Sequence, residues 1–170
     1  IGLSIGESPI ARGYTPSIYS ALPKLLERAG NTKNGSITGL YTVLVEGDDS
    51  NEPISDTVRG IIDGHIMLSR KIAMKNHYPA IDILSSISRL MSDIASDHHK
   101  KLASKIRQLM AVYQENEDLI SIGAYKSGSN PKLDEAIKKI DQINQFLVQE
   151  VSQVSSFEES IEFMERVLKV

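Results

Sequence analysis

The feature that most constrains this chain is an alternation of two kinds of segment that stops near residue 95. Up to that point, short β-branched and apolar runs alternate with stretches of helical periodicity, and beyond it every apolar stretch has helical spacing. Apolar strands separated by helices predict an α/β fold with mainly parallel strand pairing. We therefore expect two parts: an α/β part over residues 1–95 and a helical bundle over residues 96–170.

The first helix has clear start and stop signals. Thr15 is a good N-cap and Pro16 suits the first helical position, whereas Gly30 ends the pattern. Pro23 falls inside this segment and predicts a kink. One apolar face runs along the helix through Ile18, Leu22, Leu25, Leu26 and Ala29.

Three runs in the first part predict strands. Residues 36–46 are β-branched and aromatic without helical period, which predicts a buried strand, and residues 47–53 form an acidic loop after it. A short helix over residues 55–62 leads to a second strand over residues 65–68. A third strand is expected over residues 80–84.

Arg89 lies just beyond the third predicted strand. In α/β sheets, sites gather at the carboxyl ends of strands, so this arginine is a candidate for chemistry. The alternative is an ordinary surface arginine past a strand end.

The second part consists of amphipathic helices. One is predicted over residues 101–118, a glycine and serine loop over residues 123–130 follows, and Pro131 begins the next helix. Ser156 with Glu159 matches a capping box before the last helix. The apolar stripes of the last two helices are Leu133, Ile137, Ile140, Ile143 and Leu147, and then Ile161, Met164, Val167 and Leu168.

Composition excludes several classes of function. The 170 residues carry a net charge of −3 with both signs mixed, so no basic face suggests nucleic acid. The absence of cysteine excludes disulfides, thiol chemistry and cysteine-bound metal. No apolar run approaches the length of a membrane span and no signal peptide is visible, so we expect a soluble protein. Because the sequence starts at Ile1 without methionine, we expect a piece of a longer chain.

No complete active site is visible from spacing. The sequence has no phosphate-binding P-loop, no dinucleotide-binding glycine motif and no nucleophile elbow. His98 and His99 are adjacent and would diverge on a helix, so a solvated helix start is favoured over a metal pair. Asp48 and Asp49 diverge for the same reason, and a solvated loop is favoured over a Mg²⁺ site.

Several longer segments resemble a known family. They are residues 13–17, 22–30, 35–39, 41–49, 51–53, 58–70 and 77–82. These segments resemble the export ATPases of the bacterial flagellum and of type III secretion and, more distantly, the catalytic subunit of rotary ATP synthases. Residues 58–60 (Val-Arg-Gly) with 63–65 (Asp-Gly-His) are closer to the flagellar branch.

The resemblance implies the C-terminal part of a RecA-like nucleotide-binding domain, followed by a helical domain. In such proteins the phosphate loop, the water-activating glutamate and the magnesium-coordinating aspartate precede the position of Ile1. The resemblance thus implies that ATP with Mg²⁺ is used by a longer protein, and that residues 1–170 alone are inactive and hold no metal with their own side chains.

The resemblance also implies roles for three residues. Arg89 matches an arginine finger that reaches in trans to the γ-phosphate held by a neighbouring subunit. Tyr78 matches an aromatic residue that packs on adenine, and Phe146 matches a second adenine-pocket aromatic more loosely. For each of them, ordinary packing is the alternative.

Partners follow from the resemblance as well. The acidic loop residues Asp48, Asp49, Ser50 and Asn51 match a stalk-facing segment, and residues 123–139 match a second one. The implied assembly is a cytoplasmic homohexamer at the inner face of the membrane. Its implied partners are a stalk protein, an ATPase regulator, chaperone–cargo complexes and the export gate. Two alternatives stay open: a virulence secretion ATPase, and a non-catalytic module that binds the stalk protein or a chaperone.

Overall fold

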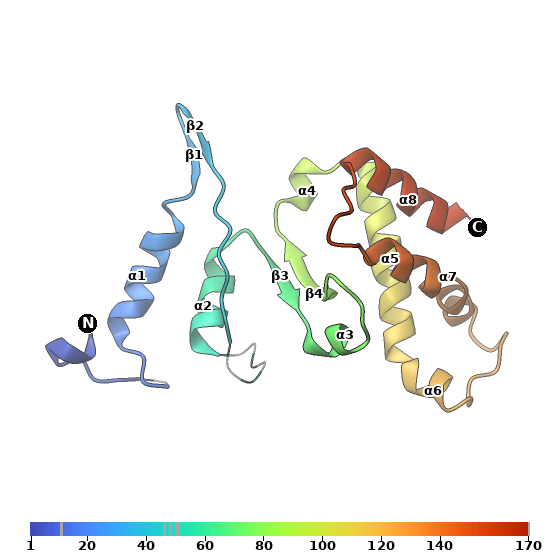
Figure 1. Cartoon of the computed structure of the whole chain (residues 1–170), viewed down its shortest axis with the longest axis horizontal. Coiled ribbons are helices and arrows are strands. Elements are labelled where there is room, and N and C mark those ends of the chain that lie inside the picture. The colour runs from blue at the N-terminus through green and yellow to red at the C-terminus, as the bar shows by residue number, and fades with distance from the viewer. Residues whose placement is uncertain (11, 46, 48, 50–51, 170) are drawn as a thin grey trace. The chain divides into compact units, whose positions relative to one another are not determined.

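A computed structural model describes residues 1–10, 12–45, 47, 49 and 52–169 of the chain (Figure 1). Its packing divides the chain into two compact units, residues 1–65 and residues 66–170, which we describe separately. Among the described residues, none of the helices is both long enough and apolar enough to cross a membrane.

The first unit begins with a 3₁₀ turn, η1 (Leu3–Ile5), and the helix α1 (Pro16–Leu26). Thr15 is the N-cap of α1, as predicted, but its hydroxyl is hydrogen-bonded to the Ser17 hydroxyl (3.0 Å) and not to a backbone amide. The backbone N–H of Ser17 donates instead to the Glu7 carboxylate (3.1 Å). Glu7, ten residues upstream, therefore supplies the acceptor for a backbone N–H in the first turn of α1.

The helix α2 (Pro53–Ile61) packs against α1. It is capped by Glu52, whose carboxylate accepts a hydrogen bond from the Ser55 N–H (3.0 Å). Leu26 and Val58 are the buried apolar side chains of this unit, at 8 % and 5 % exposure among the described residues. The apolar core of this unit is therefore small.

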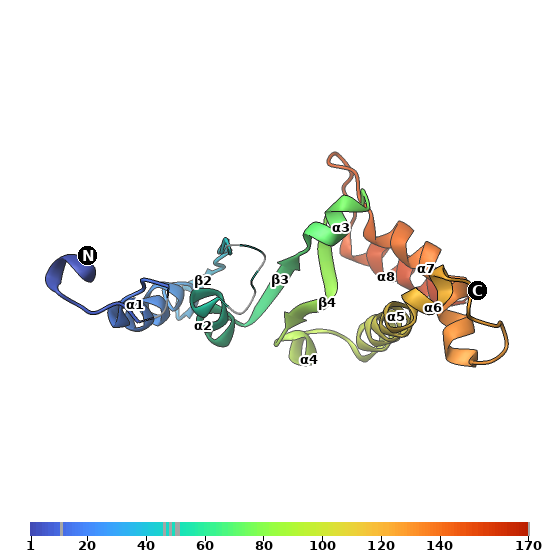
Figure 2. The same ribbon diagram turned by 90° about the horizontal axis from the view of Figure 1, so that it is seen from below.

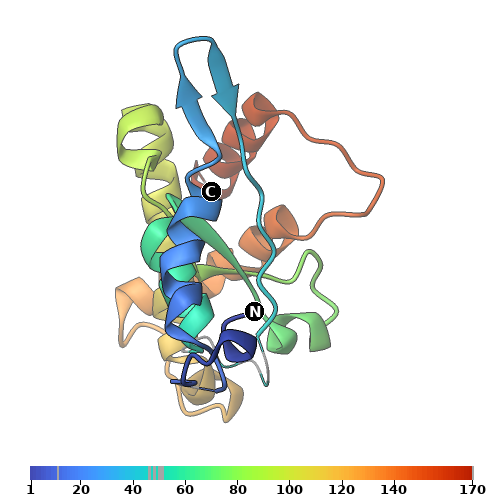
Figure 3. The ribbon, with the colours of Figure 1, turned by 90° about the vertical axis from the view of Figure 1, so that its left-hand side faces the viewer.

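A hairpin extends beyond the end of α1 (Figure 3). Its strands β1 (Gly30–Thr32) and β2 (Gly35–Ile37) pair antiparallel, with Gly30 opposite Ile37 and Thr32 opposite Gly35. The predicted buried strand over residues 36–46 is wrong, because β2 ends at Ile37 and residues 38–45 are not in a strand. An apolar run becomes a buried strand only beside another strand, and the described residues supply none here.

The strands β3 (Gly64–Leu68) and β4 (Ile81–Ser88) form a second two-stranded sheet, joined through the helix α3 (Arg70–Met74). The N–H of Ser69, directly after β3, donates to the carbonyl of Ala80, directly before β4 (2.9 Å). The chain thus enters β4 beside the point where it leaves β3, and the two strands run antiparallel (Figure 1). The expected parallel pairing is found in neither sheet, because each connection returns the chain to the end it has just left.

Five helices make up the rest of the second unit. They are α4 (Met91–Ile94), α5 (Asp97–Glu115), α6 (Glu117–Ser121), α7 (Pro131–Leu147) and α8 (Phe157–Lys169). The predicted single helix over residues 101–118 is divided between α5 and α6, which meet at Asn116. The predicted capping box is confirmed: Glu159 N–H donates to the Ser156 hydroxyl (3.1 Å) and Ser156 N–H to the Glu159 carboxylate (2.7 Å).

The core lies where α5, α7 and α8 pack on one another (Figure 2). Its buried members are Ile106, Leu109, Ala136, Ile143, Met164 and Val167. Lys139 is also buried, at 6 % exposure, and its ammonium group donates to the carbonyl of Val167 (2.7 Å). A lysine outside the predicted apolar stripe is thus buried, and it satisfies a carbonyl in the last turn of α8.

Candidate functional site

Arg89 follows the last residue of β4 and precedes α4, in a bend of the chain. The residue is exposed to solvent. Its backbone carbonyl accepts a hydrogen bond from the Ser92 hydroxyl (3.5 Å), which links the bend to the first turn of α4. The sequence prediction of an arginine just past a strand end is therefore confirmed in position.

Within β4, Asp82 closes a local turn through hydrogen bonds to the residues that follow it. The Asp82 carboxylate accepts hydrogen bonds from the backbone N–H groups of Leu84 (3.0 Å) and Ser85 (3.1 Å). The Ser86 hydroxyl donates to the Asp82 carbonyl (2.6 Å) and accepts from the N–H of Met67 on β3 (2.9 Å). Aspartate side chains often bind backbone groups a few residues further on, so Asp82 is the sequence signal for this local turn.

Arg107, on α5, binds the same turn from the other side. Its guanidinium donates to the carbonyls of Ile83 (2.5 Å), Leu84 (3.1 Å) and Ser86 (3.2 Å). Sequence reasoning missed this residue, because its acceptors are backbone carbonyls more than 20 residues away and leave no residue pattern.

Tyr78 lies before the other end of β4 and is 53 % exposed. Its carbonyl accepts a hydrogen bond from the N–H of Gln149 (2.9 Å), which brings it beside the segment that follows α7. Phe146 is three residues before Gln149 and half-buried, with its ring 5.3 Å from that of Phe163. The two predicted aromatics thus belong to neighbouring segments of one unit, but one face of Phe146 already packs on the core.

Tyr78 and Arg89 lie beyond opposite ends of β4. Eight residues of extended chain span roughly 26 Å, at about 3.3 Å per residue. The turn at Asp82 shortens that span, but the two side chains still sit at different ends of the strand. The structure therefore separates Arg89 from the two aromatics.

Of the four acidic loop residues predicted to face a stalk, Asp49 is described, whereas Asp48, Ser50 and Asn51 lie outside the described residues. Asp49 forms an ion pair with Arg12. Next to it, the Ser55 N–H lowers the pKa of the Glu52 carboxyl, and the Glu52 carboxylate raises the pKa of the Tyr14 hydroxyl. This polar cluster anchors the C-terminal side of the loop.

The second predicted stalk-facing region, residues 123–139, is held by Asp134. Its carboxylate accepts hydrogen bonds from the Tyr125 hydroxyl (2.9 Å), the Gly128 N–H (2.9 Å) and the Ser127 hydroxyl (3.3 Å). The Tyr125 hydrogen bond is the main reason that the pKa of Asp134 lies below its usual value. The loop is thereby folded back on the first turn of α7.

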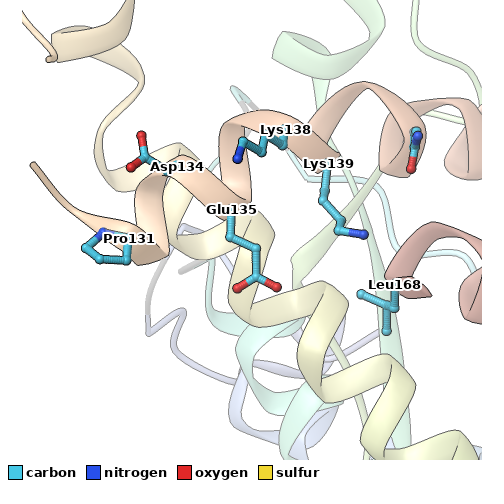
Figure 4. Close-up of a pocket in the computed structure, with 7 residues that line it drawn as sticks. Pro131, Asp134, Glu135, Lys138, Lys139 and Leu168 are labelled. Carbon is cyan, nitrogen blue, oxygen red and sulfur yellow. The ribbon is translucent and has the colours of Figure 1, made fainter. Parts of the chain in front are cut away.

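A groove of about 700 Å³ runs along α7 towards the end of α8 (Figure 4). Glu135, Lys138 and Lys139 line it together with Leu168. Both charge signs are present, and Glu135 is already paired with Lys105 on α5 (2.7 Å). Because the groove is lined by acidic, basic and apolar side chains, its lining does not indicate one class of ligand.

A metal-binding cluster is absent from the part of the chain that the structure describes. There, no three histidine, aspartate or glutamate side chains lie where they could share an ion. The structure supplies an exposed arginine on a supported bend and an aromatic pair some distance from it. By themselves these groups can stabilise developing negative charge and stack on a planar ring, but they provide neither a nucleophile nor a general base.

Two sequence profiles match the chain. Residues 1–88 match the ATP synthase alpha/beta family, nucleotide-binding domain, and residues 95–166 match the T3SS EscN ATPase C-terminal domain. Among curated proteins, the chain is 55 % identical over 161 residues to the flagellum-specific ATP synthase of Bacillus subtilis, covering 95 % of this chain. It is 50 % identical over 167 residues to the type 3 secretion system ATPase of Xanthomonas euvesicatoria, covering 98 % of this chain. The chain spans 37 % and 38 % of the lengths of these two relatives.

Solved structures give the same match. The assembled ATPase EscN from the enteropathogenic E. coli type III secretion system superposes with a TM-score of 0.95 at 47 % identity, over 98 % of this chain and 40 % of that one. EscN in complex with its central stalk EscO gives a TM-score of 0.86 at 45 % identity, over 98 % of this chain and 39 % of that one. The fold predicted from the sequence, a RecA-like fragment followed by helices, is therefore confirmed, although the strand pairs described here are antiparallel.

Proposed function

Because the chain belongs to the ATP synthase alpha/beta family, we propose that it is part of an ATP-hydrolysing ring that energises flagellar protein export. The second candidate is the corresponding ATPase of a virulence secretion system, favoured by relatives of that kind at nearly the same identity. Both candidates use the same chemistry and the same residues of this chain. We assign residues 1–95 to the nucleotide-binding domain and residues 96–170 to the helical domain, because Ser96 caps α5 directly after α4 has ended.

Arg89 is the proposed catalytic residue, and it acts on the nucleotide of a neighbouring subunit. Phosphoryl transfer is accelerated by positioning and by neutralising charge on the transferred group, and an arginine supplied in trans contributes roughly 10³–10⁵ in rate. A planar, permanently charged guanidinium suits that task better than a lysine. The observation that carries the proposal is the location of Arg89: exposed, on a supported bend, and at the end of β4 opposite to Tyr78.

Tyr78 and Phe146 are the proposed adenine contacts. The half-exposed ring of Tyr78 is free to stack on a base, which contributes on the order of 1–3 kcal/mol. Phe146 offers less ring surface, since it packs on Phe163. The phosphates and Mg²⁺ are assigned to parts of the longer protein outside residues 1–170, so these residues alone do not turn over ATP.

The proposed assembly is a cytoplasmic homohexamer, peripheral at the inner membrane. A ring is the natural closed form of a head-to-tail interface in which each subunit completes the site of the next. Asp49 and the rest of the acidic loop, together with residues 123–139, would face a coiled-coil stalk protein. The solved structure of EscN in complex with its central stalk EscO supports this assignment by similarity. The regulator, chaperone–cargo complexes and export gate remain proposed partners on the same grounds of family.

The test is steady-state ATP turnover of the full-length protein with Arg89→Ala. We expect a loss of about 10³–10⁵-fold with nucleotide affinity unchanged. Mixing Arg89→Ala subunits with phosphate-loop-deficient subunits should restore part of the turnover, because an intact loop then faces an intact arginine in some interfaces. Arg28→Ala, another exposed arginine, is the control for loss of charge. Unchanged turnover of the Arg89→Ala protein would refute the assignment, and failure of mixing to restore it would refute action in trans.

A further inference from the structure

The three hydrogen bonds from Arg107 to the turn in β4 are unusual because all of their acceptors are backbone carbonyls of one short segment. In the same segment, the N–H groups of Leu84 and Ser85 donate to the Asp82 carboxylate. Partly buried backbone carbonyls need hydrogen-bond donors. One planar guanidinium with several N–H groups supplies them together, which a lysine ammonium does less well.

The turn that Arg107 binds is close to Arg89 in the chain. Only Ile87 and Ser88 separate Ser86, whose carbonyl accepts from Arg107, from Arg89. On the far side, the Arg89 carbonyl accepts from the Ser92 hydroxyl. Arg89 is thus held between two anchors, and the N-terminal one depends on a side chain of the helical domain.

We propose that Arg107 is a positioning residue for Arg89: it fixes the β4 turn and so sets where the arginine finger presents its guanidinium. This inference rests on the proposed function of Arg89. A displacement of about 1 Å in a positioned group can cost on the order of 10²-fold in rate. We therefore expect Arg107→Gln to lower kcat by roughly 10- to 100-fold while KM for ATP stays within about twofold.

The reason for the split between kcat and KM is that the finger acts on the transition state. An interaction made only there changes kcat and leaves ground-state binding alone. Loss of fold or of ring assembly would instead lower the amount of active enzyme and weaken ADP binding.

The experiment uses the full-length protein without stalk protein. Turnover, ADP affinity and affinity for ADP with aluminium fluoride, which mimics the transferring phosphoryl group, are measured for Arg107→Gln, Arg107→Lys and Arg89→Ala. We expect Arg107→Gln to weaken the fluoroaluminate complex but not ADP binding, and Arg107→Lys to lie between it and the unsubstituted protein. The matched control is Lys105→Gln, which removes a cation from the same helix that pairs with Glu135 and not with β4.

A double variant separates positioning from general destabilisation. Once Arg89 is alanine, Arg107→Gln should weaken the fluoroaluminate complex no further, because the residue through which it acts is gone. Additive losses, equal losses of ADP and fluoroaluminate binding, or an unchanged kcat in Arg107→Gln would each overturn the inference. If Arg89→Ala itself leaves turnover unchanged, the proposed function fails. If only Arg107→Gln is without effect, this inference alone fails.

Discussion

The helices after residue 96 and the unit before residue 66 differ in how far each covers its own apolar side chains. On α7, Leu133 and Ile143 are 1 % and 0 % exposed. In the first unit, Leu40 and Leu44 are 92 % and 91 % exposed, although both lie in a strongly apolar run. The same kind of residue is thus buried by its own unit in one region and left uncovered in the other.

The difference follows from where each element finds its hydrogen bonds. A helix satisfies its own backbone, so three amphipathic helices that follow one another can close a core locally. An extended segment needs another strand to supply its backbone hydrogen-bond partners, and it needs neighbouring elements to bury its apolar side chains. Residues 38–45 have no such neighbouring strand among the described residues, and Leu40 and Leu44 are correspondingly exposed.

The largest effect that tests this comparison is expected when a large aliphatic side chain is replaced by alanine, once in each region. Ile143→Ala removes a fully buried side chain from the meeting point of the helices, and we expect a loss of about 2–5 kcal/mol in the free energy of unfolding. Leu44→Ala removes a side chain that is 91 % exposed, and we expect a change within about 0.5 kcal/mol. Urea unfolding of the 170-residue chain, followed by helical circular dichroism, measures both.

If both variants lost a similar amount of unfolding free energy, the two regions would not differ as described. Such a result would mean that Leu44 is covered in solution by another part of this chain.

The helices of the second part were predicted, but only some of their buried residues were. The 3.6-residue stripe identified Leu133 and Ile143, and the Ser156–Glu159 pair identified a cap, because both signals are local. The apolar pattern did not predict the burial of Ala136 and Lys139. Alanine is small, and Lys139 is buried because its ammonium group donates to a carbonyl on another helix.

The strands were less predictable, and so was the support of the candidate site. An apolar run does not state its partner or direction, so residues 36–46 and the parallel pairing were both predicted wrongly. The position of Arg89 followed from the end of a strand. Arg107 did not, because its three acceptors are backbone groups that any residue type would supply. Its role became visible only with the geometry.

A smaller effect is expected at the start of α7. The Asn130 side chain accepts hydrogen bonds from the N–H groups of Lys132 (3.1 Å) and Leu133 (3.4 Å). Asn130→Ala should lower the free energy of unfolding of the helical part by about 1 kcal/mol, as is typical of lost N-caps. Asn144→Ala, an exposed position on the same helix, is the matched control. Equal effects at both positions would show that the cap contributes nothing beyond helix propensity.

The smallest expected effect concerns pH and Asp134. Its pKa in the folded chain lies below 3.8, chiefly because the Tyr125 hydroxyl donates to the carboxylate. A lowered folded pKa means that the stabilisation is fully present above the unfolded value of 3.8 and is lost as pH falls through the folded pKa. Asp134→Asn should therefore lower the melting temperature slightly at neutral pH and flatten its decline below pH 3.8.

Tyr125→Phe provides the internal check on that assignment. It removes the largest cause of the shift but leaves the hydrogen bond from the Gly128 N–H to the carboxylate (2.9 Å) in place. NMR titration should then find the pKa of Asp134 closer to its ordinary value, with a weaker acid dependence of stability than in the unsubstituted chain. If the pKa of Asp134 stays where it was, the Gly128 N–H and not the Tyr125 hydroxyl holds residues 123–130 on α7.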